Sequence, residues 1–165
     1  VLGRLKQLLG DQAFAVQEAD ACDQSQIVQL LTRFDVTAVI HFAALKAVGE
    51  SVVQPLRYFE NNNQALLSVL KAISSIAKDR YIHLVYSSSA TVYGDPDQVP
   101  ITESAALRPT NPYAWTKVIG EQLILAQQHW LAHAVDRNVE RNRLVPAGWL
   151  IDDRLVGNHC GFLNG

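Results

Sequence analysis

The sequence contains no methionine, only two cysteines and no long apolar run. Cys22 and Cys160 are far apart and lack a ligand spacing, so they indicate neither a disulfide framework nor a metal site, and a reducing cytoplasm is the simplest compartment. No apolar segment approaches the roughly 20 residues of a membrane-spanning helix. Charged residues interrupt the amino-terminal segment too early for a signal peptide. We therefore expect no metal and no membrane association.

Neither sign of charge is in large excess. The chain carries 14 basic and 16 acidic residues, a formal net charge of -2, which argues against binding to nucleic acid. Apolar residues make up 48% and charged residues 18% of the 165 residues, which is typical of a globular domain with a sizeable core. Because methionine is absent, Val1 is predicted not to be a natural start.

The most informative stretch begins with residues 81–86. They are apolar, β-branched or aromatic at most positions, which predicts an interior parallel strand. The serines at 87–89 follow at its carboxyl end, where open α/β sheets bind ligands. Farther along, Asn111 and Pro112 predict the start of a helix, because Asn is a favoured N-cap and Pro is favoured at the first helical position.

Tyr113 and Lys117 are four residues apart on this predicted helix and therefore share one face. A free tyrosine has a pKa of about 10 and is a poor base at neutral pH, but a lysine ammonium one helical turn away favours the phenolate. A serine hydroxyl from the strand end could bond the same substrate oxygen and complete a proton-transfer site. The alternative is a chance pair on an ordinary helix; the upstream serines and the Asn-Pro cap favour the functional interpretation.

Three segments resemble the extended short-chain dehydrogenase/reductases, and within them the NAD-dependent UDP-glucose 4-epimerases. They read SSSATVYGDP at 87–96, NPYAWTK at 111–117 and HFAALKAVGES at 41–51. Ala90 and Thr91 stand where the related sugar-nucleotide 4,6-dehydratases carry acidic residues. Trp115 departs from the family pattern, and we expect it to point away from the face shared by the Tyr and the Lys.

The resemblance implies NAD as cofactor, a UDP-sugar as substrate and the interconversion of UDP-glucose and UDP-galactose in galactose metabolism. A tyrosine phenolate would take the proton of the sugar 4-hydroxyl while hydride moves to NAD, and the 4-keto sugar would turn over before hydride returns. The implied catalytic residues are Ser89, Tyr113 and Lys117, and the implied substrate contacts are Lys46, Ser89, Thr91 and Tyr113. The implied NAD contacts are Asp20, Ala21, Phe42, Ala43, Ala44, Lys46, Asn61, Ser87, Tyr113 and Lys117.

The remaining pattern predicts further elements of an α/β protein. Residues 13–19 and 36–44 are predicted strands, the second ending in small residues that let a flat ligand approach the backbone. Residues 26–34 have the apolar spacing of an amphipathic helix. Without the resemblance, Asp20 is as readily a turn residue. His41 is interpreted as a packed strand residue, because no partner for a histidine base is evident.

The longest predicted helix, residues 55–77, carries two apolar stripes where a helix covering one sheet needs a single face. One stripe is predicted to lie on the sheet and the other on a partner helix. The resemblance implies a homodimer through this helix and the helix at 112–129; a wide face buried within one subunit is the alternative. Three asparagines, Asn61, Asn62 and Asn63, lie in the middle of this predicted helix although asparagine has a low helix propensity. We interpret Asn62 and Asn63 as solvated or packed residues.

The chain has no Gly-x-x-Gly-x-x-Gly turn, which a Rossmann dinucleotide site needs at a helix amino terminus to hold the pyrophosphate. We therefore expect a partial Rossmann-like, doubly wound parallel sheet over residues 1–130 that lacks its first two strands. Unpaired strand edges are costly. The chain alone is accordingly expected to fold poorly, to bind NAD weakly and to be inactive.

Residues 131–165 do not match the family and are predicted to be a divergent tail, as from a truncated or frame-shifted gene. His133, His159 and Cys160 match no metal-ligand spacing. Two alternatives to a UDP-glucose 4-epimerase stay open. One is an epimerase acting on UDP-N-acetylhexosamines or UDP-glucuronate, and the other is a non-catalytic chain that serves as a dimerisation module.

Overall fold

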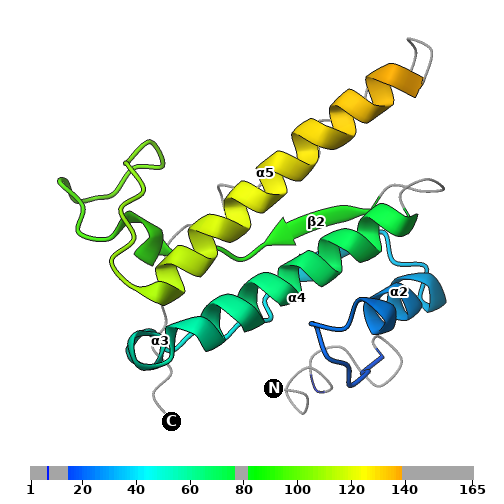
Figure 1. Ribbon diagram of the computed structural model, residues 1–165, viewed down its shortest axis with the longest axis horizontal. Helices are drawn as coiled ribbons and strands as arrows, with labels where there is room; N and C mark the ends of the chain where they lie inside the picture. The colour runs from blue at the N-terminus through cyan, green and yellow to red at the C-terminus, as the bar shows by residue number, and fades with distance from the viewer. Residues whose placement is uncertain (1–6, 8–14, 77–81, 139–165) are drawn as a thin grey trace.

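The described part of the molecule is a βαβ unit with further helices packed beside it (Figure 1). The computed structural model describes residue 7 and residues 15–76 and 82–138, with the side chains of 129–138 excepted. The elements in chain order are α2 (Gln24–Arg33), β1 (Ala38–His41), α3 (Val48–Val53), α4 (Pro55–Ile76), β2 (His83–Tyr86), the 3₁₀ helix η1 (Ala90–Tyr93) and α5 (Pro112–Asn138).

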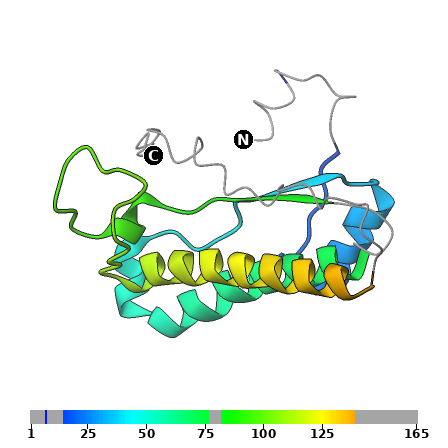
Figure 2. The ribbon, with the colours of Figure 1, turned by 90° about the horizontal axis from the view of Figure 1, so that it is seen from above.

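The two strands are parallel neighbours, with Ala38 opposite His83 and His41 opposite Tyr86. A parallel pair needs a crossover connection, which α3 and α4 supply. Figure 2 shows α4 and α5 side by side as one layer along the sheet, and the two helices are in contact. The predicted α/β class with a parallel sheet is therefore confirmed.

Most predicted elements occur where the sequence placed them. The helices predicted at 26–34 and 55–77 are α2 and α4, and the strands predicted at 36–44 and 81–86 are β1 and β2. The strand predicted at 13–19 is wrong in its described part, because residues 15–19 form no regular structure. A strand needs a hydrogen-bonded neighbour, and among the described residues only β1 and β2 form a ladder.

Asp23 caps the start of α2. Its carboxylate accepts hydrogen bonds from the backbone N–H groups of Ser25 and Gln26, which a helix start otherwise leaves unpaired. Hydrogen bonds from Ser25 and Gln26 lower the pKa of this carboxyl to about 2. The helix then packs on α4 through Leu31, which is buried.

The hydrophobic core lies between α4, α5 and the inner face of the sheet. Its buried members are Leu31, Leu66, Val69, Leu70, Ala72, Ile73, Ile82, Leu84, Tyr86 and Ile124. Both predicted stripes of α4 contribute to it, because Leu66, Leu70 and Ile73 of one stripe and Val69 and Ala72 of the other are buried. Among the described residues of the first stripe, only Leu56, in the first turn, is exposed.

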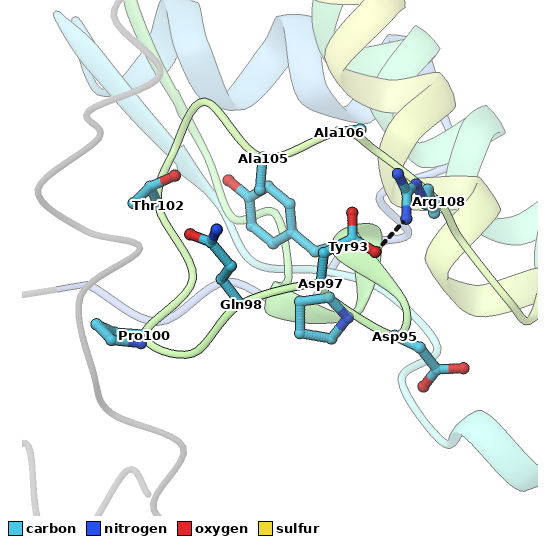
Figure 3. Close-up of a pocket in the computed structure, with 10 residues that line it drawn as sticks. Tyr93, Asp95, Asp97, Gln98, Pro100, Thr102, Ala105, Ala106 and Arg108 are labelled. Atoms are coloured by element: carbon cyan, nitrogen blue, oxygen red, sulfur yellow. Dashed lines mark hydrogen bonds and ion pairs between the residues drawn. The ribbon is translucent and has the colours of Figure 1, made fainter.

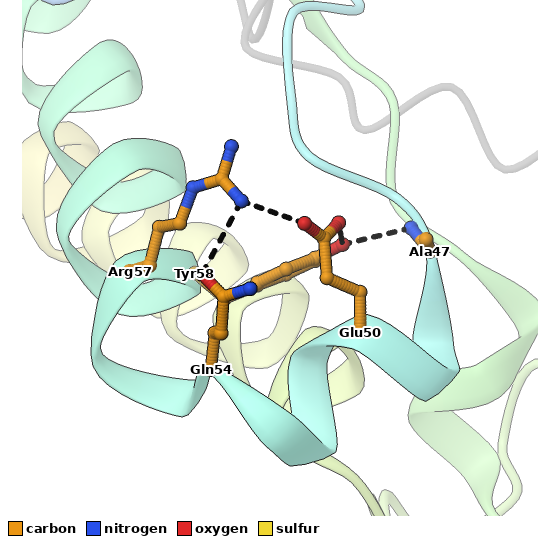
Figure 4. A network of polar contacts seen from close by, with 5 residues as sticks. All are labelled: Ala47, Glu50, Gln54, Arg57 and Tyr58. Carbon is orange, nitrogen blue, oxygen red and sulfur yellow. Dashed lines mark hydrogen bonds and ion pairs between the residues drawn. The ribbon is translucent and has the colours of Figure 1, made fainter.

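A polar network holds α3 against the start of α4 (Figure 4). Tyr58 donates a hydrogen bond from Oη to Glu50 Oε2 at 2.7 Å and accepts one from the backbone N–H of Ala47 at 3.1 Å. Arg57 pairs with Glu50 at 2.6 Å and bonds Gln54 Oε1 at 3.4 Å. The network therefore anchors the loop that leaves β1.

The other face of the sheet is open within the described residues. Ile40 is 58% and Phe42 72% exposed, although interior parallel strands are normally covered on both faces. Figure 2 shows α4 and α5 on one side of the strands, with no described helix on the opposite side.

Candidate active site

Helix α5 begins where the sequence predicted. Asn111 Oδ1 accepts a hydrogen bond from the backbone N–H of Ala114 at 2.9 Å, and Pro112 is the first helical residue. Tyr113 and Lys117 are both buried, whereas Trp115 is 48% exposed. Trp115 therefore points away from the Tyr113/Lys117 face, as expected.

Lys117 is fixed at the carboxyl end of β2. Its Nζ donates a hydrogen bond to the backbone carbonyl of Ser87 at 2.7 Å, and the side chain is 3% exposed. Nζ lies 4.9 Å from the centre of the Tyr86 ring and 5.9 Å from the centre of the Tyr113 ring. Both distances fall within the range of cation–π attraction. Three of the predicted residues, Ser87, Tyr113 and Lys117, are thus brought together.

Two features of the surroundings shift the pKa of Lys117 in opposite directions. Burial disfavours the ammonium and lowers the pKa of Lys117 to about 8, while the Glu121 carboxylate acts in the opposite direction. At neutral pH the ammonium form therefore remains dominant. A positive charge next to a tyrosine is the arrangement that favours a phenolate.

His41 packs in the core beneath this lysine. Its ring stacks on Tyr86, with 6.0 Å between ring centres and 12° between ring planes. Burial, and then the charge of Lys117, lower the pKa of His41 to about 4, so the ring is neutral near pH 7. Burial first, and then Glu121, raise the pKa of Tyr86. The interpretation of His41 as a packed strand histidine agrees with this position.

Ser89 and Thr91 form a pair of hydroxyls at the start of η1. Their oxygens are 2.9 Å apart, and Ser89 Oγ also accepts a hydrogen bond from the backbone N–H of Thr91. In the described part of the chain Ser89 bonds Thr91 and not Tyr113. Gly94 ends η1 with a φ of 59°, where a Cβ would collide with the carbonyl of Arg108.

The loop after η1 folds around Tyr93 and forms a pocket of about 190 Å³ (Figure 3). Arg108 closes one side through an ion pair with Asp97 at 2.9 Å. The residues that line the pocket are Tyr93, Asp95, Pro96, Asp97, Gln98, Pro100, Thr102, Ala105, Ala106 and Arg108. None of the residues predicted to be catalytic lines this pocket.

The predicted cofactor residues at the end of β1 are accessible. Phe42, Ala43 and Lys46 are exposed, and Ala44 is half-buried. Asn62, which the sequence interpretation left as solvated or packed, is the residue that holds this loop. Its amide accepts from the Leu45 N–H at 2.8 Å, donates to the Leu45 carbonyl at 3.0 Å and donates to Thr116 Oγ1 at 3.1 Å.

A second group of predicted cofactor residues meets beside α4. Asp20 Oδ1 accepts a hydrogen bond from the backbone N–H of Cys22 at 2.8 Å, and Cys22 Sγ donates to the Asn61 carbonyl at 3.6 Å. Cys22 therefore brings the neighbouring Asp20 and Ala21 close to Asn61, which is distant in sequence. A shallow pocket of about 410 Å³ opens here, lined by Cys22, Arg57, Glu60, Asn61 and Gln64.

Two functional features are not found in the described residues. No three His, Cys, Asp or Glu side chains there come together in a way that could hold a metal ion. Within the same residues, every helix is too short or too polar to cross a membrane. The side chains of His133, His159 and Cys160 lie outside this description.

Comparison with known families identifies the chain. The family model described as GDP-mannose 4,6 dehydratase matches residues 2–136. The chain belongs to this family. It is 42% identical over 123 residues to the UDP-glucose 4-epimerase of Bacillus subtilis and 41% identical over 126 residues to that of Caenorhabditis elegans. These matches cover 74% and 75% of the chain but 35% of each relative, so the chain spans about a third of the length of these relatives.

Solved structures of this family agree with the fold. A UDP-glucose 4-epimerase from Bifidobacterium longum in complex with NAD+ and UDP superimposes with a TM-score of 0.67 at 34% identity, over 83% of this chain and 38% of that one. One from Stenotrophomonas maltophila, with bound NAD and formylated UDP-arabinopyranose, gives 0.70 at 37% identity, over 79% and 37%. The predicted resemblance and the partial Rossmann-like fold are confirmed.

Sequence reasoning missed two site residues besides Asn62. Glu121 accepts a hydrogen bond from the Ser88 hydroxyl, and it lies four residues after Lys117 on the same helical face. That spacing could have signalled it. Gly120 lies against Tyr86, since a Cβ at Gly120 would collide with the Tyr86 hydroxyl. No pattern in the sequence indicates that contact.

Proposed function

We propose that the chain carries the proton-transfer residues and one side of the cofactor site of a UDP-sugar 4-epimerase, with UDP-glucose and UDP-galactose as its substrates. The observation that carries the proposal is the buried Lys117, which is bonded to the Ser87 carbonyl and lies beside the Tyr113 ring. The cysteine pattern is consistent with a cytoplasmic enzyme. Galactose metabolism is the corresponding process.

Each residue has a role that follows from its position. Tyr113, as phenolate, takes the proton of the sugar 4-hydroxyl and later returns a proton to the same oxygen. The Lys117 ammonium stabilises that phenolate, and the Ser87 carbonyl keeps the ammonium in place. Ser89 and Thr91, whose hydroxyls are paired at the strand end, bond the sugar oxygen.

The residues at the end of β1 fit NAD. Phe42 and Ala43 are exposed there without a covering side chain in the described structure, and Asp20 and Asn61 meet at a second accessible point. Small residues at a strand end let a flat ligand approach the backbone. Lys46 is exposed and can meet phosphate or ribose. NAD held by these residues would supply the hydride acceptor and donor for sugar carbon 4.

Similarity favours UDP-glucose over N-acetylated sugars. The two UDP-glucose 4-epimerase structures described above are 37% and 34% identical to this chain, against 28% for the UDP-Glc/GlcNAc 4-epimerase from Campylobacter jejuni and 31% for a UDP-N-acetylglucosamine 4-epimerase from Methanobrevibacter ruminantium. UDP-galactose is therefore the first substrate to assay.

The test is interconversion of UDP-galactose and UDP-glucose, followed by NMR, for the 165-residue chain and for the full-length gene product. The substitution Tyr113→Phe should lower kcat by about 10²- to 10⁴-fold, the usual range for a lost general base, while NAD stays bound. Tyr93→Phe is the matched control, because Tyr93 lies in the loop pocket, and should retain the wild-type rate. A Tyr113→Phe enzyme with near-normal kcat would remove Tyr113 as the base.

We further propose a homodimer formed through α4 and α5. Trp115 and Leu125 are 48% and 37% exposed on α5, and Leu56 is 74% exposed on α4, which leaves apolar side chains on the outside of this layer. Trp115→Glu should convert the dimer to a monomer in light scattering after gel filtration. The control Gln98→Glu adds the same charge at an exposed position of the loop between η1 and α5, and should leave the dimer intact. An unchanged mass for Trp115→Glu would exclude this surface.

A further inference from the structure

Ser88 and Glu121 form a hydrogen bond that the proposed proton transfer does not use. The Ser88 hydroxyl donates to the Glu121 carboxylate across 33 residues of sequence. Ser88 directly follows Ser87, whose carbonyl accepts the hydrogen bond from Lys117, and Glu121 lies one helical turn after Lys117. Two consecutive residues of the strand end are therefore bound by two consecutive turns on one face of α5.

Next to this contact, the Tyr86 side chain of β2 lies against Gly120 of α5. Gly120 allows it, because any Cβ at that position would collide with the Tyr86 hydroxyl. Lys117 in turn lies over the Tyr86 ring, with 4.9 Å between Nζ and the ring centre. The contact between Ser88 and Glu121 is therefore a second tie between the end of β2 and α5, beside the bond from Lys117 to Ser87.

Glu121 also acts on the ionisable groups that face it. These are Lys117 on its own helix, Tyr86 at the end of β2 and Tyr93 in η1. Burial and then the Glu121 carboxylate raise the pKa of both tyrosines, and Glu121 raises the pKa of Lys117 against the effect of burial. His41 and Tyr113 complete the set of titratable neighbours of Lys117.

We propose that Glu121 is a positioning residue. Its hydrogen bond from Ser88, called the clasp below, holds the end of β2 in place. In that position the Ser87 carbonyl meets Lys117, and Ser89 stays beside α5. The catalytic consequence rests on the proposed epimerase function, whereas the clasp itself does not. Loss of the Glu121 charge alone lowers the pKa of Lys117, so the removal of the Ser88 hydroxyl is the decisive change. If the contact between Ser88 and Glu121 only stabilised the fold, Ser88→Ala would lower the unfolding temperature and leave the titration of Lys117 in the folded protein unchanged.

The experiment uses the full-length gene product with ¹³C-labelled lysine. The Lys117 signal is assigned with Lys117→Arg and titrated by NMR in wild type, Ser88→Ala, Glu121→Gln, the double variant and the exposed control Gln122→Ala. Glu121→Gln should lower the midpoint of Lys117 by about one pH unit, the low end of the effect of a neighbouring opposite charge. Ser88→Ala should also lower the midpoint of Lys117. The shift in the double variant should be smaller than the sum of the two single shifts, because both changes break the same contact.

Turnover provides the second readout. Ser88→Ala and Glu121→Gln should each lower kcat by about 10- to 100-fold with little change in KM, as expected for misplaced catalytic groups, and Gln122→Ala should change neither. Wild-type midpoints in Ser88→Ala, or strictly additive shifts, would overturn the clasp. If Glu121→Gln does not fold, Ser88→Ala, which removes a single hydroxyl, decides the question. Coupled shifts without any turnover in wild type would reject the proposed function and retain the clasp.

Discussion

The carboxyl ends of the two strands lie next to each other but differ in how the chain holds them. At the end of β2, Ser87 and Ser88 are tied to Lys117 and Glu121 on α5. At the end of β1, Phe42 is 72% exposed, and the first anchor of the loop is Leu45, held by Asn62. The end of β2 is therefore organised by the chain's own contacts, while the end of β1 presents open surface. Under the proposed function, the pair of Tyr113 and Lys117 is preorganised before any ligand binds.

His41 connects the two ends, and its titration gives the largest expected effect. The folded protein holds the pKa of His41 at about 4, below the ordinary 6.5, so the unfolded chain binds the proton first as the pH falls. Stability should therefore decrease between pH 6.5 and pH 4, by about 3 kcal/mol from this group. Urea unfolding across this range measures it. His41→Phe should remove that part of the slope; a wild-type slope in His41→Phe would contradict the assignment.

Gly120 tests how closely β2 approaches α5. Gly120→Ala should lower the free energy of unfolding by about 1 to 3 kcal/mol, because the methyl group overpacks against Tyr86. Gly49→Ala in α3 is the matched control, since a Cβ there meets nothing within 4 Å, and it should gain up to about 1 kcal/mol from helix propensity. Denaturant unfolding of both variants checks the opposite signs. Equal signs would mean that the β2 end is not tightly packed.

Phe42 tests the open side and has the smallest expected effect on stability. Phe42→Ser should change the free energy of unfolding by no more than about 0.5 kcal/mol, because the side chain is largely exposed in the described structure. Under the proposed function it should nevertheless weaken NAD binding, which calorimetry measures. A large loss of stability would show that the end of β1 is as organised by the chain as the end of β2.

Local sequence signals predicted most of the elements and the shared face of Tyr113 and Lys117 well. The Asn111-Pro112 start of α5, the shared face of Tyr113 and Lys117 and the length of α4 each depend on neighbours within a few residues. The strand predicted at 13–19 was wrong in its described part for the opposite reason, since a strand exists only with a partner far away in sequence. Helix α5 continues to Asn138, beyond the boundary predicted at residue 130.

By itself the sequence determined the family, the α/β class and the placement of Tyr113 and Lys117 on one helical face, because these depend on motifs and helical spacing. Only the tertiary structure decided how that site is held. The bonds from Lys117 to Ser87 and from Asn62 to Thr116 join residues 30 and 54 apart, and no local pattern specifies them. Burial in the folded protein then lowers the pKa of Lys117, because desolvation depends on what surrounds a group and not on its sequence neighbours.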